Sequence, residues 1–591
     1  MLEPQGRAAL TEQLTPPVGY QLSHAVGTTF TLDLLTALSI PLSFASRRLS
    51  SADDRLGVLD AVRRSADRVD VFAQAGEVGM GKPSDLVALL EPMIHPVAVR
   101  RGLFHPKVWF LEYRSGDRLS YRFLCASRNL TEDRSWDTLV RLDGAAGEDA
   151  EPTNAPLVSL LRTLPRLSVV PLPDERRTRI ERLAARLQNV TWEHPSDVRS
   201  VDFHVFGMPD SVQPDVSGIR SLIISPFVSE DALQTLRRGV RGPTHLISRA
   251  ATLDRLPAEC DDDRLRTYVL DDAAVIPDDS DDDAASGTGA DRLTGLHAKV
   301  IVTDRAAGAQ VLIGSANATG AALSHNVEVM VRMTGATPRL GVDATLAALG
   351  DLTAEYAPDW GASELADEAA QRRLEALVRG LAQVRFTARV AFADPWSLTV
   401  WAADAEDTLT RLSEAEVSLR WHLLTRTDLG QPLLSLTEAQ ATPLTGIPLT
   451  DITPFLVLVA RDAAGNERRT VVLAELLDDV PDRKDAIVAR QLTDQATFLR
   501  LLALLLDLGG DAVFGGVGSG GAFGAGSDGP VSGLFEALVR SIGADGDGLV
   551  EARRIIDFIR RHEETDQLLP PEFEELWANV WSAHDAVTRR R

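Results

Sequence analysis

The sequence predicts an α/β protein with an internal repeat, followed by a small β-sandwich and a C-terminal helical domain. Three observations support this prediction. A block of His-x-Lys followed downstream by Ser-x-Asn occurs twice, and each copy contains two short apolar runs of strand length. Short alternating runs fill residues 386–480. Longer helical patterns then fill residues 481–591.

The first block predicts a β-hairpin that ends in four polar groups. His105 and Lys107 are two residues apart, so they share one face of an extended strand. The apolar run at 108–112 meets turn residues, and a return strand at 121–126 leads to Ser127 and Asn129. Because the turn falls about midway, such a hairpin brings its two ends together.

The second block repeats this plan with His297 and Lys299, strand-like runs at 300–303 and 310–314, and then Ser315 and Asn317. Each hairpin thus presents an imidazole, an ammonium, a hydroxyl and a carboxamide at one sheet edge. A site for a phosphate monoanion needs this set of groups. The chain has only 11 histidines and 4 lysines, so two matching triplets are not expected by chance.

The repeat extends to a late carboxylate in each half, because residues 135–141 align with residues 326–332. Asp137 and Glu328 occupy the same position in this alignment. A carboxylate that accepts from one imidazole nitrogen fixes the tautomer and raises the basicity of the other nitrogen. We therefore assign these two acids to the histidines. Glu112 and Asp304, five residues after each lysine, are expected near the hairpin tips in structural roles.

The second block, from His297 to Asn317, matches the pattern His-x-Lys-x4-Asp followed by Gly-Ser-x-Asn, and the chain resembles the phospholipase D superfamily in this respect. The first block has Glu112 and Ala126 where the pattern has aspartate and glycine. The resemblance covers about residues 20–340 and is greatest to the phospholipase D-like nucleases of bacteria.

The resemblance implies two pseudo-symmetric α/β lobes with one shared site at their interface, which needs no metal and no cofactor. It implies that one histidine attacks phosphorus while the other protonates the leaving oxygen and then activates water. By analogy we expect His105 to be the nucleophile and His297 the acid. The non-bridging oxygens would be bound by Lys107, Lys299, Asn129 and Asn317.

Composition and charge limit the classes of protein and substrate that fit this chain. The first 30 residues contain no basic leader with an apolar core, and no apolar run reaches 18 residues, so we expect a cytoplasmic protein without membrane association. Cys125 and Cys260 indicate neither a disulfide framework nor a zinc site. The net charge of −24 still permits a nucleic-acid substrate, because phosphate tracking needs only a local basic strip. Candidate arginines, which equally fit a general use of arginine in place of lysine, are Arg100, Arg101, Arg237, Arg238 and Arg241.

Three functions remain open. The favoured one is a metal-independent phosphodiesterase that cleaves DNA, as an endonuclease of bacterial antiviral defence or repair working with a helicase or another defence-system protein. The alternatives are a phospholipase or phosphatidyl-transfer enzyme, and a catalytically weak scaffold that binds phosphate. A homodimer is left open, and the sequence does not fix strand or sequence preference.

The predicted domains are lobe 1 at 1–190, lobe 2 at 191–345, a helical linker at 346–385, a β-sandwich at 386–480 and a helical domain at 481–591 with a Gly-rich loop at 509–533. Within these domains, helices are expected at 54–68, 174–188 and 486–508, and a strand is expected at 221–228. An acidic segment at 261–283 is expected to form a disordered surface loop, and its position before His297 suggests the further hypothesis that it screens the site against nonspecific polyanions. The P-loop-like run at 76–82 precedes Pro83 instead of Ser or Thr, so a turn is favoured over nucleotide binding. Packed or surface positions are expected for His24, His95, His204 and His245.

Overall fold

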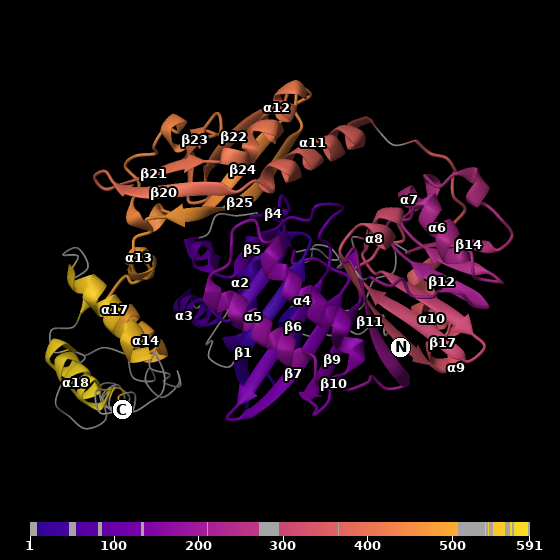
Figure 1. Ribbon diagram of the computed structural model, residues 1–591, viewed down its shortest axis with the longest axis horizontal. Helices are drawn as coiled ribbons and strands as arrows, with labels where there is room; N and C mark the ends of the chain where they lie inside the picture. The colour runs from indigo at the N-terminus through magenta and orange to yellow at the C-terminus, as the bar shows by residue number, and fades with distance from the viewer. Residues whose placement is uncertain are drawn as a thin grey trace, which may run out of the picture.

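The computed structural model shows two α/β lobes side by side, a β-sheet domain lying across lobe 1, and a group of helices at the end away from lobe 2 (Figure 1). It describes residues 9–45, 55–80, 85–131, 135–209, 211–270, 295–363, 366–505, 538, 542, 548–561, 568–569 and 573–588.

Lobe 1 is built on a seven-stranded mixed sheet in the order β10-β9-β7-β6-β1-β3-β5. The strands of this sheet are β1 (Gln21–Thr29), β3 (Val69–Gln74), β5 (Ile94–Val97), β6 (Val108–Ser115), β7 (Arg118–Ala126), β9 (Leu139–Ala146) and β10 (Val190–Trp192). The shorter strands are β2 (Leu32–Asp33), β4 (Val78–Gly79) and β8 (Ser135–Trp136). The helices are α1 (Leu10–Leu14), α2 (Leu34–Ala45), α3 (Arg55–Ala66), the 3₁₀ helix η1 (Asp85–Leu90), α4 (Ala155–Leu167) and α5 (Asp174–Leu187).

Lobe 2 is built on an eight-stranded sheet in the order β11-β18-β17-β16-β12-β13-β14-β19. Its strands are β11 (Val198–Phe206), β12 (Arg220–Ile224), β13 (Thr244–Ile247), β14 (Leu265–Leu270), β16 (Val300–Arg305), β17 (Gly308–Gly314), β18 (Glu328–Gly335) and β19 (Thr353–Glu355), with the short β15 (Gly295–Leu296) outside the sheet. The helices are α6 (Glu230–Arg237), α7 (Ala250–Asp254), α8 (Gly320–Ser324), α9 (Thr337–Leu340) and α10 (Val342–Leu349).

The two lobes repeat one topology, which confirms the predicted α/β fold. Each predicted hairpin forms, as the antiparallel pair β6–β7 in lobe 1 and β16–β17 in lobe 2. In each sheet the hairpin lies between an antiparallel third strand, β9 or β18, and a pair of parallel strands, β1–β3 or β12–β13. The sequence forms these strands because apolar residues fill both faces of the central strands, as in a sheet covered on both sides.

The lobes share one hydrophobic core. Phe123 of β7 packs edge-on against Phe203 of β11 with ring centroids 5.2 Å apart, and Trp192 of β10 lies 6.4 Å from Phe203. The short strands β8 and β15 pair in parallel and join the lobes by backbone hydrogen bonds. Burial of large aromatic side chains at this seam fixes the lobes against each other.

The third domain contains α11 (Ala366–Ala382), β20 (Phe386–Phe392), β21 (Trp396–Trp401), α12 (Glu406–Glu414), β22 (Ser418–Leu423), β23 (Arg426–Gln431), β24 (Phe455–Arg461) and β25 (Glu467–Leu477). The strands predicted as a sandwich lie in one six-stranded sheet, in the order β21-β20-β25-β24-β22-β23. The second layer is formed by helices, because the apolar faces of α11 and α12 supply Leu374, Val378 and Leu412 to the core over this sheet.

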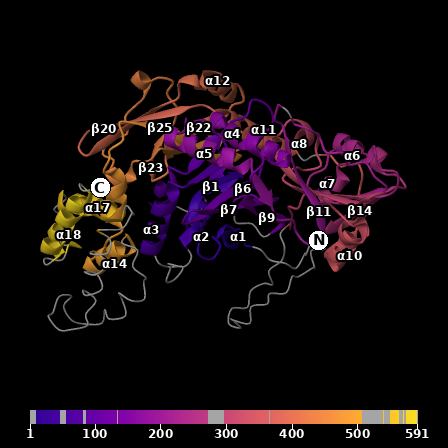
Figure 2. The same cartoon turned by 60° about the horizontal axis from the view of Figure 1, so that its bottom comes forward.

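The C-terminal helices α13 (Arg483–Arg490), α14 (Gln495–Leu505), α17 (Gly548–Arg561) and α18 (Phe573–Thr588) gather beside α3 of lobe 1. They share an apolar core with lobe 1, which includes Val62 of α3, Phe498 of α14 and Ile556 of α17. Figure 2 shows the β-sheet domain arching over lobe 1 with these helices at one end. The added domains therefore pack on lobe 1 and leave the seam between the lobes uncovered by the C-terminal helices.

Buried ion pairs anchor the added domains to lobe 1. Arg483 of α13 donates to both carboxylate oxygens of Glu91, at 2.9 and 2.8 Å, and both residues are buried. Glu77, just after β3, accepts from Arg379 of α11 and Arg468 of β25, each at 2.8 Å. Each acid thus ties arginines of the added domains to lobe 1.

The P-loop-like run at 76–82 begins in a packed turn. Gly76 has φ of +89°, and a Cβ on this residue would lie 2.7 Å from the Cα of Arg379. Glycine is therefore required here by backbone conformation and by the close approach of α11. This is the turn role that the sequence favoured, although residues 81–84 lie outside the described residues.

Two predicted elements differ from the structure. The helix predicted at 486–508 is divided into α13 and α14, because Asp494 caps a new helix by accepting from Thr497 N at 2.8 Å. The strand predicted at 221–228 ends at Ile224. Most of the acidic segment, from residue 271 on, and the Gly-rich loop at 509–533 lie outside the described residues. Among the described residues, no helix has the length and apolarity needed to cross a membrane.

Candidate active site

The two His-x-Lys motifs meet at the seam, and each is held by the backbone of the other lobe. His105 N donates to Val327 O at 2.9 Å, and His297 N donates to Trp136 O at 2.8 Å. Val327 and Trp136 directly precede Glu328 and Asp137. The exchange is therefore reciprocal, and each lobe places its late carboxylate beside the histidine segment of the other lobe.

The serines of the two Ser-x-Asn motifs occupy matching backbone positions. Ser127 Oγ accepts from Thr138 N at 2.8 Å, and Ser315 Oγ accepts from Val329 N at 3.0 Å. Both serines are fully buried. Each serine thus fixes the backbone next to a late carboxylate, since Thr138 and Val329 follow Asp137 and Glu328. We assign the serines to positioning this backbone.

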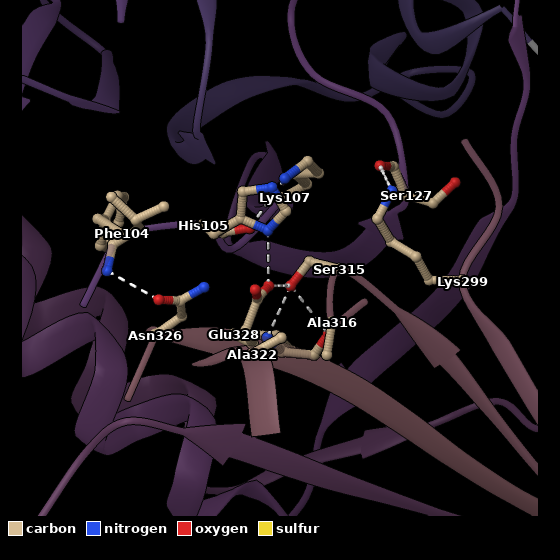
Figure 3. Close-up of polar contacts among 12 residues, drawn as sticks. Phe104, His105, Lys107, Ser127, Lys299, Ser315, Ala316, Ala322, Asn326 and Glu328 are labelled. Carbon is tan, nitrogen blue, oxygen red and sulfur yellow. Dashed lines mark hydrogen bonds and ion pairs between the residues drawn. The ribbon is translucent and has the colours of Figure 1, made fainter. Parts of the chain in front are cut away.

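Glu328 reaches across the seam to His105 (Figure 3). His105 Nδ1 lies 2.9 Å from Glu328 Oε2, and Ser315 Oγ donates to the same oxygen. Glu328 is fully buried, and its Oε1 has no hydrogen-bond partner among the described residues. An ionised carboxylate at Nδ1 holds the proton on that nitrogen, so the lone pair of His105 is on Nε2.

The two lysines lie at the same seam. Lys107 Nζ donates to His105 O at 3.0 Å, and Lys299 Nζ donates to His297 O at 2.7 Å. Lys299 also lies 3.3 Å from the carbonyl oxygen of Ser127, in the opposite lobe. Both side chains are buried. Each lysine is therefore held beneath its own histidine by the backbone of its motif.

Burial and charge shift the ionisation of these groups in the unliganded site. Burial lowers the pKa of His105 to about 4, with the Glu328 carboxylate opposing the shift and both lysines adding to it. Burial also lowers the pKa of Lys107 well below its usual value, with Glu328 opposing and Lys299 adding. A bound phosphodiester anion would offset the repulsion between the two lysines. His105 is neutral at pH 7, as a nucleophile requires.

The two asparagines match one another as well. In both Asn129 and Asn317 the side-chain oxygen is buried and has no hydrogen-bond partner among the described residues. Buried amide groups are normally satisfied. Two such groups, each two residues after a site serine, fit carboxamides that bond to a substrate. A half-turn about the last side-chain bond would present each NH₂ group instead.

The structure separates two acids from the site. Glu112 is paired with Arg186 at 2.8 Å and accepts from Ser23 Oγ. Asp304 bonds to Arg220 and to the backbone N of Val342 at the start of α10. Both acids lie toward the far ends of the hairpins and fasten helices to the sheets, in line with the structural roles expected from the sequence.

Phe30 is a contact of the site that the sequence analysis did not identify. Its ring lies 5.0 Å from the His105 ring, and Lys107 Nζ lies 5.9 Å from the Phe30 centroid. The residue follows directly after β1. An aromatic residue at the end of a buried strand was the available signal, but it is also typical of an ordinary core position.

Two of the other histidines, His24 and His95, have packing roles. His24 and His95 are buried in lobe 1 and both contact Asp70, at 2.9 and 2.8 Å, together with Arg176. These hydrogen bonds and charges outweigh burial and lower the pKa of Asp70. Within the described part of the chain, no group of three or more histidine, cysteine or acidic side chains is arranged to hold a metal ion.

No protein-family model matches this chain, and no curated protein matches it. Among solved structures, yeast tyrosyl-DNA phosphodiesterase is similar at 11% identity and a TM-score of 0.35, over 55% of this chain and 85% of that one. Polyphosphate kinase from Porphyromonas gingivalis is similar at 13% identity and a TM-score of 0.32, over 63% and 51%. Phosphatidylserine synthase of Haemophilus influenzae Rd KW20 is similar at 15% identity and a TM-score of 0.33, over 63% and 91%.

Proposed function

We propose that this protein hydrolyses phosphodiesters without a metal ion, through a phosphohistidine on His105, and that its substrate is DNA. One observation carries the proposal. Two His-x-Lys motifs meet at one seam, with buried lysines from both lobes close to a histidine whose Nδ1 is held by Glu328. The two lysines offer donor groups from both lobes to the non-bridging oxygens of one phosphodiester anion.

The arrangement supports an in-line displacement in two steps. His105 Nε2 attacks phosphorus, the bond to the leaving oxygen breaks, and His297 donates a proton to that oxygen. Neutral His297 then takes a proton from water, the water oxygen attacks phosphorus, and the P–N bond to His105 breaks. The two lysines stabilise the charge on the non-bridging oxygens in both steps.

His105 is the better candidate for the nucleophile. Glu328 fixes its tautomer, and the imidazole carries positive charge only once it is bonded to phosphorus, when the carboxylate stabilises it. The backbone next to Asp137 takes the corresponding position relative to His297, since Trp136 O accepts from His297 N. Among the described residues, no hydrogen bond to His297 Nδ1 corresponds to the one between Glu328 and His105 Nδ1. We assign Asp137 to the orientation of His297 during proton transfer.

Support for a polynucleotide substrate comes from arginines next to the seam. Arg100 and Arg101 are exposed and precede the first motif, and Leu103 N nearby donates to Asn326 Oδ1 of lobe 2 at 3.0 Å. The second candidate strip is less suitable, because Arg237 is paired with Asp262 at 2.6 Å. We also propose, from the sequence resemblance, a role in bacterial defence or repair beside a helicase or similar partner.

The test is cleavage of supercoiled plasmid and labelled single-stranded DNA in EDTA by the full chain. Wild type should nick or cleave, and the His105→Ala/His297→Ala double variant should not. A Glu112→Gln variant is the matched control, because it removes a buried acid of lobe 1 that lies away from the site. Equal cleavage by wild type and the double variant would refute the proposed site. Phosphatidylcholine hydrolysis in place of DNA cleavage would refute the proposed substrate.

A further inference from the structure

Phe227 is a large aromatic side chain that lies exposed beside the candidate active site. Its side chain is 48% exposed, although it lies only three residues beyond the end of the buried strand β12. The strand ends because Ser225 Oγ donates to Phe227 O at 2.7 Å and accepts from Ala318 N at 2.9 Å. These bonds turn the chain outward and hold Phe227 in a defined loop.

Phe227 and Arg249 are held near opposite ends of the second motif. The loop of Phe227 is fixed to Ala318, the residue after Asn317, since Ser229 N donates to Ala318 O at 2.9 Å. On the other side, Arg249 donates to Leu296 O, the carbonyl just before His297, at 3.0 Å. The Arg249 guanidinium carbon lies 4.8 Å from the centroid of the Phe227 ring. The loop of Phe227 is thus bonded to the residue after Asn317, and Arg249 is bonded to the residue before His297. The ring and the guanidinium therefore lie close to both ends of the second motif.

The corresponding loop of lobe 1 uses its aromatic residue differently. Thr29 makes the same pair of bonds as Ser225, donating to Thr31 O at 2.8 Å and accepting from Leu130 N at 3.1 Å. In that loop the aromatic residue is Phe30, one position earlier, and its ring packs against His105. Of these two loops, only the one in lobe 2 presents its aromatic ring to solvent. The two sides of an otherwise symmetric site therefore differ.

We propose that Phe227, supported by Arg249, is a stacking platform for one unpaired nucleobase next to the scissile phosphate, on the lobe 2 side. The guanidinium covers one face of the ring, and the exposed area is available to a base. Aromatic rings beside a cationic phosphate site bind single strands in this way, whereas the bases of a duplex are already stacked on one another. This inference rests on the proposed function and narrows its substrate to single-stranded polynucleotides.

The test uses the full chain and a short labelled oligodeoxynucleotide in which methylphosphonates replace every phosphodiester except one. Versions with an abasic residue on either side of that single linkage remove one base at a time. The variants are Phe227→Ala, Phe227→Leu and Phe227→Trp. Phe392→Ala is the control, because Phe392 is a 75% exposed aromatic residue of the β-sheet domain.

On the substrate with both bases, Phe227→Ala and Phe227→Leu should lower kcat/KM by about 5- to 150-fold, mainly by raising KM. Phe227→Trp and Phe392→Ala should remain close to wild type. Removing the base on one side should reduce wild-type kcat/KM by a similar factor, and Phe227→Ala should then cause no further loss.

Two results would overturn the inference. Equal effects of Phe227→Ala on the base-containing and abasic substrates would show that the ring does not contact a base, while DNA cleavage itself would stand. Failure of wild type to cleave any polynucleotide in EDTA would refute the proposed function, and the platform with it. Phe227→Leu keeps most of the apolar side chain, so the comparison holds even if Phe227→Ala folds poorly.

Discussion

Replacing Glu328 by glutamine removes the charge that holds His105 and leaves the shape of the side chain nearly unchanged. The carboxylate is buried and lies 2.9 Å from His105 Nδ1. The two charge centres are about 4 Å apart when the imidazole is positive, which gives about 4 kcal/mol at an effective dielectric constant of about 20. Loss of this stabilisation in the phosphohistidine step corresponds to a rate reduction of about 10³-fold.

The same variant has a predicted pH signature. Burial lowers the pKa of His105 to about 4 and Glu328 opposes that shift. Attack requires neutral His105, so wild-type kcat/KM should fall as pH drops through about 4. Without the carboxylate the pKa decreases further, and this acid limb should move to lower pH in Glu328→Gln.

The assay is steady-state cleavage of labelled single-stranded DNA in EDTA across this pH range, with stopped time points at each substrate concentration. Glu112→Gln serves as the control, because that acid is paired with Arg186 away from the site and should leave kcat within a few fold of wild type. A Glu328→Gln enzyme within about tenfold of wild type would refute the reasoning, as would an acid limb that moves to higher pH.

Three further predictions can be checked by activity and unfolding measurements. His105→Asn and His297→Asn should each reduce single-turnover cleavage by several orders of magnitude, and combining them should cost little more, because both histidines serve one site; full activity of His297→Asn would contradict the shared site. Asp70→Asn should lower the free energy of unfolding in urea by about 3–5 kcal/mol, because it leaves His24, His95 and Arg176 without their buried anion. The folded-state pKa of Asp70 lies below its ordinary value of 3.8, so this difference from wild type should be complete above that pH and shrink as pH falls further; a difference that grows on acidification would refute it. Glu91→Ala should cost about 1.5–3 kcal/mol, because it removes the buried acid bonded to Arg483 and leaves that arginine with Asp479 at 2.7 Å, whereas Glu475→Ala, which breaks the exposed pair with Arg385, should cost less than about 1 kcal/mol; similar losses for the two would contradict a rigidly docked α13.

Much of the fold follows from local sequence pattern. The hairpins that carry the motifs form where apolar runs are interrupted by turn residues, and the start of α3 and the end of α5 lie within one residue of their predicted bounds. Where the sequence pattern left a helix boundary or a strand arrangement ambiguous, tertiary contacts determined it. The apolar run after residue 486 continues past Asp494, but Asp494 caps a second helix there by accepting from Thr497 N. The short strands after α11 pair in a single sheet, and no second sheet is needed because α11 and α12 bury its apolar face.

The sequence by itself determined which side chains would gather at the ends of two hairpins, because residues two apart on a strand share a face and a midpoint turn joins the strand ends. It did not determine which carboxylate serves which histidine. Glu328 lies 223 residues from His105 and reaches it only because the lobes exchange backbone hydrogen bonds at their seam. The outward ring of Phe227 was likewise decided by the tertiary structure, since Ser225 bonds to the backbone of a distant loop and ends the strand early. Pairing between segments far apart in the chain depends on how the lobes pack, and the local sequence pattern contains no information about that packing.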